Sequence, residues 1–186
     1  MTTRQVAMLA VVPLVFACSE GPTDPSSAAS FDVAYSQAGG QERQTGHWEI
    51  VTPPLYPTML TGKYSASAVR QSDGSVAGSF EVHEIYADHT DRIHGVTTCL
   101  TVQADGSARV GGIVTHSTYP NQAYVGGAAV WLVKDNGQGR NSPPDMATDI
   151  RYGYSANVAQ LWCDGANVPQ MGMNPVVRGN IQVTGP

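Results

Sequence analysis

The sequence predicts an all-β domain of about eight antiparallel strands, closed as an up-and-down barrel or, alternatively, folded as a β-sandwich. From position 46 onward, apolar and polar residues alternate in short segments without a convincing helical period. Turn-forming residues separate these segments, and the 186 residues include 20 Gly and 12 Pro. The expected strands are 46–51, 62–71, 75–86, 92–103, 107–117, 127–135, 148–154 and 176–184, and 158–163 is a further strand or a helical turn.

Two of the expected connections contain the pair Asp-Gly, at Asp73-Gly74 and at Asp105-Gly106. This pair suits a two-residue hairpin turn or a three-residue loop with a left-handed glycine. Even-numbered apolar residues occur on both strands of each hairpin, so only an odd-length loop places them on one face, and we expect three-residue loops. The residues expected to face inward are Tyr64, Ala66, Ala68, Val76, Phe80, Val82, Val96, Leu100, Val102, Val110 and Val114.

Residues 1–17 are typical of a bacterial export signal, with Arg4 followed by an apolar segment. Ala17-Cys18 at the end of that segment resembles the lipobox of bacterial lipoproteins, which implies cleavage before Cys18 and lipidation of its thiol. An ordinary secretory signal is the alternative. Residues 18–44, rich in Ser, Ala, Gly and Pro, are expected to be the lipidated cysteine and a flexible tether. Residues 45–186 are expected to form a single β-domain.

The composition limits the classes of partner. The formal net charge is −5 and 13% of residues are charged, so the basic surface typical of nucleic-acid binding is missing and no nucleic-acid partner is expected. No apolar run reaches the roughly 18 residues that a spanning helix needs. We therefore expect the protein in the bacterial cell envelope, held at a membrane by the acyl chains on Cys18.

Cysteine usage agrees with export. With Cys18 assigned to the lipid, Cys99 and Cys163 remain, and an exported compartment permits a disulfide between them. We expect this disulfide; two buried free thiols are the alternative.

Carboxylates and histidines are concentrated between residues 81 and 94. If Asp88-His89-Thr90 is a three-residue loop, Glu84 faces His94, and the next hairpin places His94 opposite His116. The three side chains would then form a row on the inward face at one end of the sheet. Such a row could bind a divalent metal ion or act as acid and base, so Glu84, His94 and His116 are the catalytic and metal-ligand candidates. In the alternative, these polar groups at strand ends satisfy one another, and no cofactor is required.

Aromatic residues offer a second kind of site, a stacking surface for a sugar or another amphiphilic ligand. The alternative is that most of them belong to the core or rim of the β-domain. The candidates are Trp48, Tyr56, Tyr64, Tyr86, Tyr119, Tyr124, Trp131, Tyr152, Tyr154 and Trp162.

No strong catalytic motif is present in the sequence, but four short motifs occur in a fixed order. They are Val96-Thr97-Thr98-Cys99-Leu100, Gly111-Gly112, Val133-Lys134-Asp135-Asn136-Gly137 and Pro143-Pro144-Asp145. In this order the chain resembles a group of exported bacterial proteins with the pattern VTCL…GG…VxDNG…PPD. The resemblance implies a compact exported β-domain and transfers no catalytic residue.

These observations favour a non-catalytic cell-envelope lipoprotein whose β-domain binds a small ligand or another envelope component. One alternative is a metal-assisted enzyme that uses Glu84, His94 and His116. Another is a structural or protein-interaction module. A ligand-sized cavity would support the first hypothesis.

Overall fold

The computed structural model describes residues 41–51, 59–139, 141–166 and 172–185. The expected export signal, Cys18 and the expected tether up to residue 40 lie outside the described residues. Within the described part, no helix is long and apolar enough to cross a membrane.

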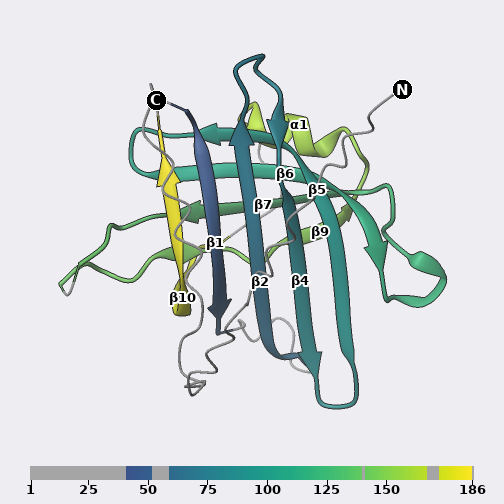
Figure 1. Cartoon of the computed structure of the whole chain (residues 1–186). Coiled ribbons are helices and arrows are strands. Elements are labelled where there is room, and N and C mark those ends of the chain that lie inside the picture. The colour runs from purple at the N-terminus through teal and green to yellow at the C-terminus, as the bar shows by residue number, and fades with distance from the viewer. Residues whose placement is uncertain (1–40, 52–58, 140, 167–171, 186) are drawn as a thin grey trace, which may run out of the picture. The chain divides into compact units, whose positions relative to one another are not determined.

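The described residues form an antiparallel sheet that closes in a ring, so the predicted all-β, antiparallel fold class is confirmed. Its ten strands are β1 (Arg43–Ile50), β2 (Met59–Arg70), β3 (Val76–Ala77), β4 (Ser79–Tyr86), β5 (Thr90–Val102), β6 (Ser107–Ser117), β7 (Ala128–Lys134), β8 (Met146–Ala147), β9 (Arg151–Tyr154) and β10 (Asn174–Thr184). Around the ring the order is β1-β10-β8-β7-β6-β5-β4-β2, and β2 pairs with β1 to close it. Figure 1 shows β10, β1, β2 and β4 side by side, with β6 and β7 crossing their direction.

Each expected strand segment contains a strand, with three differences of detail. The segment 75–86 is interrupted at Gly78 and forms β3 and β4. The short strand β8 was not expected. Residues 158–163 form the helix α1 (Val158–Cys163), the helical one of the two expectations for this segment. A single 3-10 turn, η1 (Pro120–Gln122), follows β6.

Both Asp-Gly hairpins have the expected three-residue loops. Gln71 N–H donates to the Ser75 carbonyl over 2.7 Å, and Gln103 N–H donates to the Ser107 carbonyl over 2.8 Å. Gly74 and Gly106 have φ values of 85° and 80°, so each supplies the left-handed residue of its loop. The even-numbered apolar residues of β2 and β4 therefore face each other, as expected: Tyr64 pairs with Val82 and Ala66 with Phe80.

The hairpin between β4 and β5 differs from the prediction. Tyr86 N–H donates to the His89 carbonyl over 2.9 Å, so the turn consists of Ala87 and Asp88 rather than Asp88-His89-Thr90. This shorter turn pairs Glu84 with Asp91 in place of His94. The register on β4 thus differs by three residues from the expected one. Because three is an odd number, even-numbered residues of β4 share a face of the sheet with odd-numbered residues of β5, as in the pair Val82 and Ile93.

Two irregularities in the pairing of β5 with β6 then reverse the direction of the side chains. One lies between Thr97 and Cys99 on β5, and the other lies opposite the step from His94 to Gly95. Before the first irregularity Ile93 points inward, and after it Leu100 points inward while Cys99 points outward. Val96, which we expected to face inward, is 45% exposed, so that assignment was wrong.

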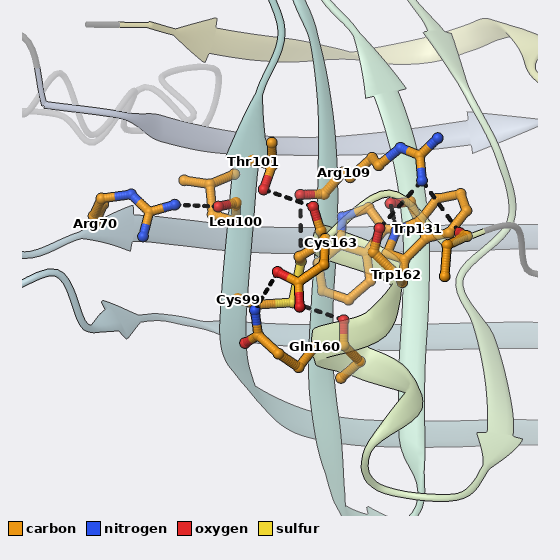
Figure 2. Close-up of a disulfide and its surroundings, with 12 residues drawn as sticks. Arg70, Cys99, Leu100, Thr101, Arg109, Trp131, Gln160, Trp162 and Cys163 are labelled. Atoms are coloured by element: carbon orange, nitrogen blue, oxygen red, sulfur yellow. Dashed lines mark hydrogen bonds between the residues drawn. A yellow bond between two sulfur atoms is a disulfide. The ribbon is translucent and has the colours of Figure 1, made fainter.

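A small outer cluster joins α1 to the sheet (Figure 2). Its buried members are Cys99, Ala128, Val130, Ala159, Trp162 and Cys163. Cys99 and Cys163 lie at disulfide distance, with S–S 2.07 Å and Cα–Cα 6.2 Å, in agreement with the expected pairing. Trp162 Nε1 donates to the Trp131 carbonyl over 3.1 Å, and the Arg109 guanidinium lies 4.5 Å from the centre of the Trp162 ring. These contacts hold α1 on the outer face of β5, β6 and β7.

Candidate functional site: a tyrosine-lined cavity around Glu84

The expected row of Glu84, His94 and His116 is not assembled. His94 does pair with His116, and their rings lie 5.9 Å apart between centroids. Both histidines point outward, however, beside Glu81, whose Oε1 lies 3.8 Å from His94 Nε2. Glu84 is buried on the inner face of the sheet. The two-residue turn at the β4–β5 hairpin separates them, because it places Glu81 rather than Glu84 opposite His94.

The expected site of Glu84, His94 and His116 is therefore absent from the described part of the chain, and Glu81 is the carboxylate near the histidines, 2.7 Å from His83 Nε2 and 3.8 Å from His94 Nε2. Among the described residues, no group of three or more His, Cys, Asp or Glu side chains is arranged to hold a metal ion. Of the three candidates, Glu84 lines the cavity described below, and His94 and His116 are not among its lining residues.

This cavity has a volume of about 260 Å³ and lies where β4 ends and where β9 and the segment after β6 come together. Five tyrosines and two carboxylates dominate its wall. Its lining residues are Met59, Glu84, Tyr86, Tyr119, Tyr124, Asp149, Ile150, Arg151, Tyr152 and Tyr154. All five tyrosines belong to the aromatic set that the sequence singled out as a stacking surface.

Glu84 is the centre of the hydrogen bonding in this cavity. Its Oε2 accepts hydrogen bonds from the hydroxyls of Tyr152 at 2.7 Å, Tyr86 at 3.0 Å and Tyr119 at 3.3 Å. The Tyr119 and Tyr152 hydroxyls also lie 3.1 Å apart. One carboxylate oxygen thus organises three phenols that come from β4, from the segment after β6 and from β9.

Burial raises the pKa of Glu84 above its ordinary value, because desolvation penalises the charged carboxylate. The three tyrosine hydroxyls oppose this effect, and the negative charge of Asp149 adds to it. The pKa values of these tyrosine hydroxyls are raised as well. Burial, together with the nearby Glu84 charge, raises the pKa of Tyr119 to about 12 and raises that of Tyr152 further. Their hydroxyl protons are therefore held firmly and remain donors at neutral pH.

The second carboxylate of the wall is already paired. Asp149 Oδ1 accepts a hydrogen bond from Arg151 Nε over 3.2 Å, and both side chains are largely buried. Arg151 is the first residue of β9, and Tyr152 follows it. The segment from residue 149 to 154 thus contributes an ion pair and two tyrosines to one wall.

Tyr124 completes the wall in a strained backbone conformation. Its φ is 76°, a left-handed value that is rare for a bulky residue, and its side chain is 40% exposed. The ring packs edge-on against Tyr119 and Tyr152, with centroid distances of 5.0 Å and 5.1 Å. Gly153 makes room for it, since a Cβ at Gly153 would lie 3.0 Å from Tyr124 Cδ1. Strain of this kind is concentrated at functional sites, where surrounding contacts maintain it.

Sequence reasoning missed Asp149, Arg151, Met59 and Ile150 as members of the site. A signal was present in the alternation of charged and aromatic residues at 149–154, where Gly153 separates two tyrosines. That signal does not reveal Glu84 as the partner, because Tyr152 and Glu84 are 68 positions apart.

The four short motifs identified in the sequence have structural roles away from the cavity. Cys99 is in the disulfide. A Cβ on Gly111 would lie 2.8 Å from Cys99 Sγ, and one on Gly112 would lie 2.3 Å from the Val96 carbonyl oxygen. Asp135 accepts backbone hydrogen bonds from residues 137 and 183, and Asp145 accepts them from residues 136 and 181. These motifs therefore hold α1 and β10 in place.

No protein family, curated protein or solved structure matches the chain at a significant level. The site must therefore be interpreted from its own geometry.

Proposed function

We propose that this protein is a cell-envelope lipoprotein whose β-domain binds a small ligand, without catalysis, in the tyrosine-lined cavity around Glu84. The observation that carries the proposal is the cavity itself. It is bordered by a nine-tenths-buried carboxylate and by aromatic rings. Apolar or aromatic walls with a few converging polar groups are typical of small-molecule sites.

The strain at Tyr124 supports a binding role for the cavity. A left-handed backbone at a non-glycine residue costs on the order of 1–3 kcal/mol. Glycine would relieve this strain, yet the position holds a partly exposed tyrosine whose ring borders the cavity. Besides packing against Tyr119 and Tyr152, the ring presents a surface that a ligand in the cavity can contact.

The test is isothermal titration calorimetry of the purified full chain with three probes: phenethylamine, 2-phenylethanol and D-glucose. We expect at least one probe to bind with a stoichiometry of one. Tyr124→Gly should weaken that binding about tenfold or more, which corresponds to about 1.4 kcal/mol. Its stability should change by less than about 1 kcal/mol, because relief of strain offsets the lost ring contacts.

Val125→Ala is the matched control, because Val125 is an exposed neighbour in the same loop and does not line the cavity. It should leave probe binding unchanged. Absence of binding for all three probes, or equal binding to Tyr124→Gly and the wild type, would overturn the proposed function.

The anchoring half of the proposal rests on the lipobox-like Ala17-Cys18 and on the low charge of the chain. Mass spectrometry of the protein isolated from bacterial membranes should find a diacylglyceryl-modified Cys18 at the N-terminus. An unmodified N-terminus at another residue would contradict the anchor and leave the cavity proposal to its own test.

A further inference from the structure

Resting on the proposed ligand-binding role of the cavity, we propose that the ligand is a small organic ammonium ion. Its charged nitrogen would lie against Glu84, and its apolar body would lie against the tyrosine rings.

The charges around the cavity leave Glu84 without a cation. Arg151 is the basic residue among the lining side chains, and it is bound to Asp149. Among the described residues, no lysine, arginine or histidine forms an ion pair with Glu84. A buried carboxylate that borders an open cavity and has only neutral partners is a site to which a cation can contribute the missing charge.

The hydrogen bonds select for a donor-rich ligand. Three tyrosine hydroxyls lie within hydrogen-bond distance of Oε2 of Glu84, and a hydroxyl that donates its proton there keeps its oxygen lone pairs as acceptors. Oε1 of Glu84 receives no hydrogen bond from any side chain in the described ranges and offers a further acceptor. An ammonium group carries donors and no acceptor, which matches this wall. An anionic ligand would instead face two carboxylates.

The aromatic walls favour the same ligand. A cation near the face of a tyrosine ring is attracted by the negative charge density there, by about 0.5–1 kcal/mol at exposed sites and more when desolvated. Tyr119, Tyr124 and Tyr152 already contact one another with centroid distances between 5.0 and 6.1 Å, so their rings form one continuous wall. The cavity volume of about 260 Å³ lies below the ~300–1,000 Å³ of drug-sized sites, which limits the body to a small group.

Desolvation acts in the same direction. Burial raises the pKa of Glu84, so its charged form is disfavoured in the empty site. A bound cation favours that charged form. Binding of an ammonium ion thus removes a penalty, whereas binding of a neutral ligand leaves it in place.

The experiment compares three probes of similar size and different charge on the full chain at pH 7.5: phenethylamine, 2-phenylethanol and 3-phenylpropionate. We expect phenethylamine to bind at least about tenfold more tightly than the alcohol, equivalent to about 1.4 kcal/mol. The carboxylate should not bind measurably. Glu84→Gln should reduce the preference for amine over alcohol to less than about threefold, while a thermal unfolding scan confirms that the variant is folded.

Glu81→Gln is the matched control, because it removes the same charge from the outer face of the same strand. It should retain the wild-type preference. The inference is overturned if the alcohol binds as tightly as the amine, if the anion binds more tightly, if Glu84→Gln keeps the full preference, or if the amine does not bind. Binding of the alcohol or of D-glucose that depends on Tyr124, when the amine binds no more tightly than they do, would overturn the inference and leave the proposed function standing.

Discussion

Asp145 and Glu84 are both about nine-tenths buried, yet their carboxylates are hydrogen-bonded in different ways. Asp145 uses both oxygens: Oδ1 accepts from Asn136 N–H over 3.0 Å, and Oδ2 accepts from Ile181 N–H over 2.9 Å. Glu84 receives three hydroxyls on one oxygen and borders a cavity. The first carboxylate joins two backbone segments, and the second is surrounded by side chains that a ligand can approach.

The difference separates structural groups from groups available for binding. A carboxylate satisfied by the backbone fixes the fold and has little left to offer a ligand. A carboxylate held by phenols can still accept hydrogen bonds from a ligand. Its raised pKa shows that burial disfavours the charged carboxylate while the cavity is empty. The four short motifs in the sequence contain Asp145 and omit Glu84, so they lie in the structural part of the molecule.

The largest effect is expected in the structural part, at the disulfide. Replacing Cys99 and Cys163 together by Ala releases a cross-link between residues 64 positions apart. The chain-entropy model gives a loss of about 4 kcal/mol in the free energy of unfolding. Urea denaturation of the full chain measures it. Ligand affinity measured far below the unfolding midpoint should be unchanged, and a large loss of affinity would show that the two regions are coupled.

Asp145→Ala should give the next largest loss, about 3 kcal/mol. The buried N–H of Ile181 and the half-buried N–H of Asn136 lose their acceptor, and each unsatisfied buried group costs about 1–3 kcal/mol. Denaturant unfolding is the measurement. Asp73→Ala, in an exposed hairpin loop, is the control and should cost much less. Equal losses for the two variants would contradict the structural role assigned to Asp145.

Features that depend on residues close in sequence or on simple counting could be predicted from the sequence, whereas features that depend on contacts between distant residues could not. Local chemistry determined the strand segments, the Asp-Gly loops and the inward residues of β2 and β4. The cysteine pairing was predicted from the expected export signal and the number of cysteines. Each of these depends on residues close in sequence or on simple counting. His94 pairs with His116 as expected because the two irregularities between β5 and β6 shift the register in opposite directions and cancel.

The predicted site was wrong because an error in the register between two strands changes the side-chain directions that are expected on each following strand. The two-residue turn at the β4–β5 hairpin moved Glu84 away from His94. The irregularity between Thr97 and Cys99 has a tertiary cause: Cys99 must face outward to reach Cys163 on α1, while Ile93 and Leu100 both remain in the core. Strict alternation cannot satisfy these three directions at once, and only the presence of α1 shows that the strand must be irregular.

Within the cavity, Tyr152→Phe should lower the free energy of unfolding by about 2 kcal/mol near neutral pH. It removes the 2.7 Å hydrogen bond to Glu84, and hydrogen bonds to charged groups contribute about 1.5–3 kcal/mol. The loss should shrink as the pH falls and Glu84 becomes protonated. Unfolding titrations at several pH values test this. A loss that is independent of pH would mean that the hydroxyl does not act on the charged carboxylate.

The smallest effect, and one of opposite sign, is expected for Glu84→Gln. Because burial raises the pKa of Glu84 in the folded state, the folded protein holds that proton more tightly than the unfolded chain does. The contribution of Glu84 to wild-type stability is therefore most favourable below the ordinary value of 4.5, falls as the pH rises towards the raised pKa, and stays reduced above it. Glutamine does not ionise and lacks this penalty.

Glu84→Gln should thus be at least as stable as the wild type at pH 7, and its advantage should disappear as the pH is lowered towards 4.5. Parallel denaturant titrations of the two proteins from pH 4 to pH 8 measure the difference, in which the contributions of all other titrating groups cancel. Glu81→Gln, on the outer face of the same strand, controls for the loss of one negative charge. A variant less stable than the wild type at pH 7 and equally so at pH 4.5 would show that Glu84 is a structural carboxylate like Asp145. A cation would then gain no relief of desolvation by binding at Glu84, because the empty site would carry no such penalty.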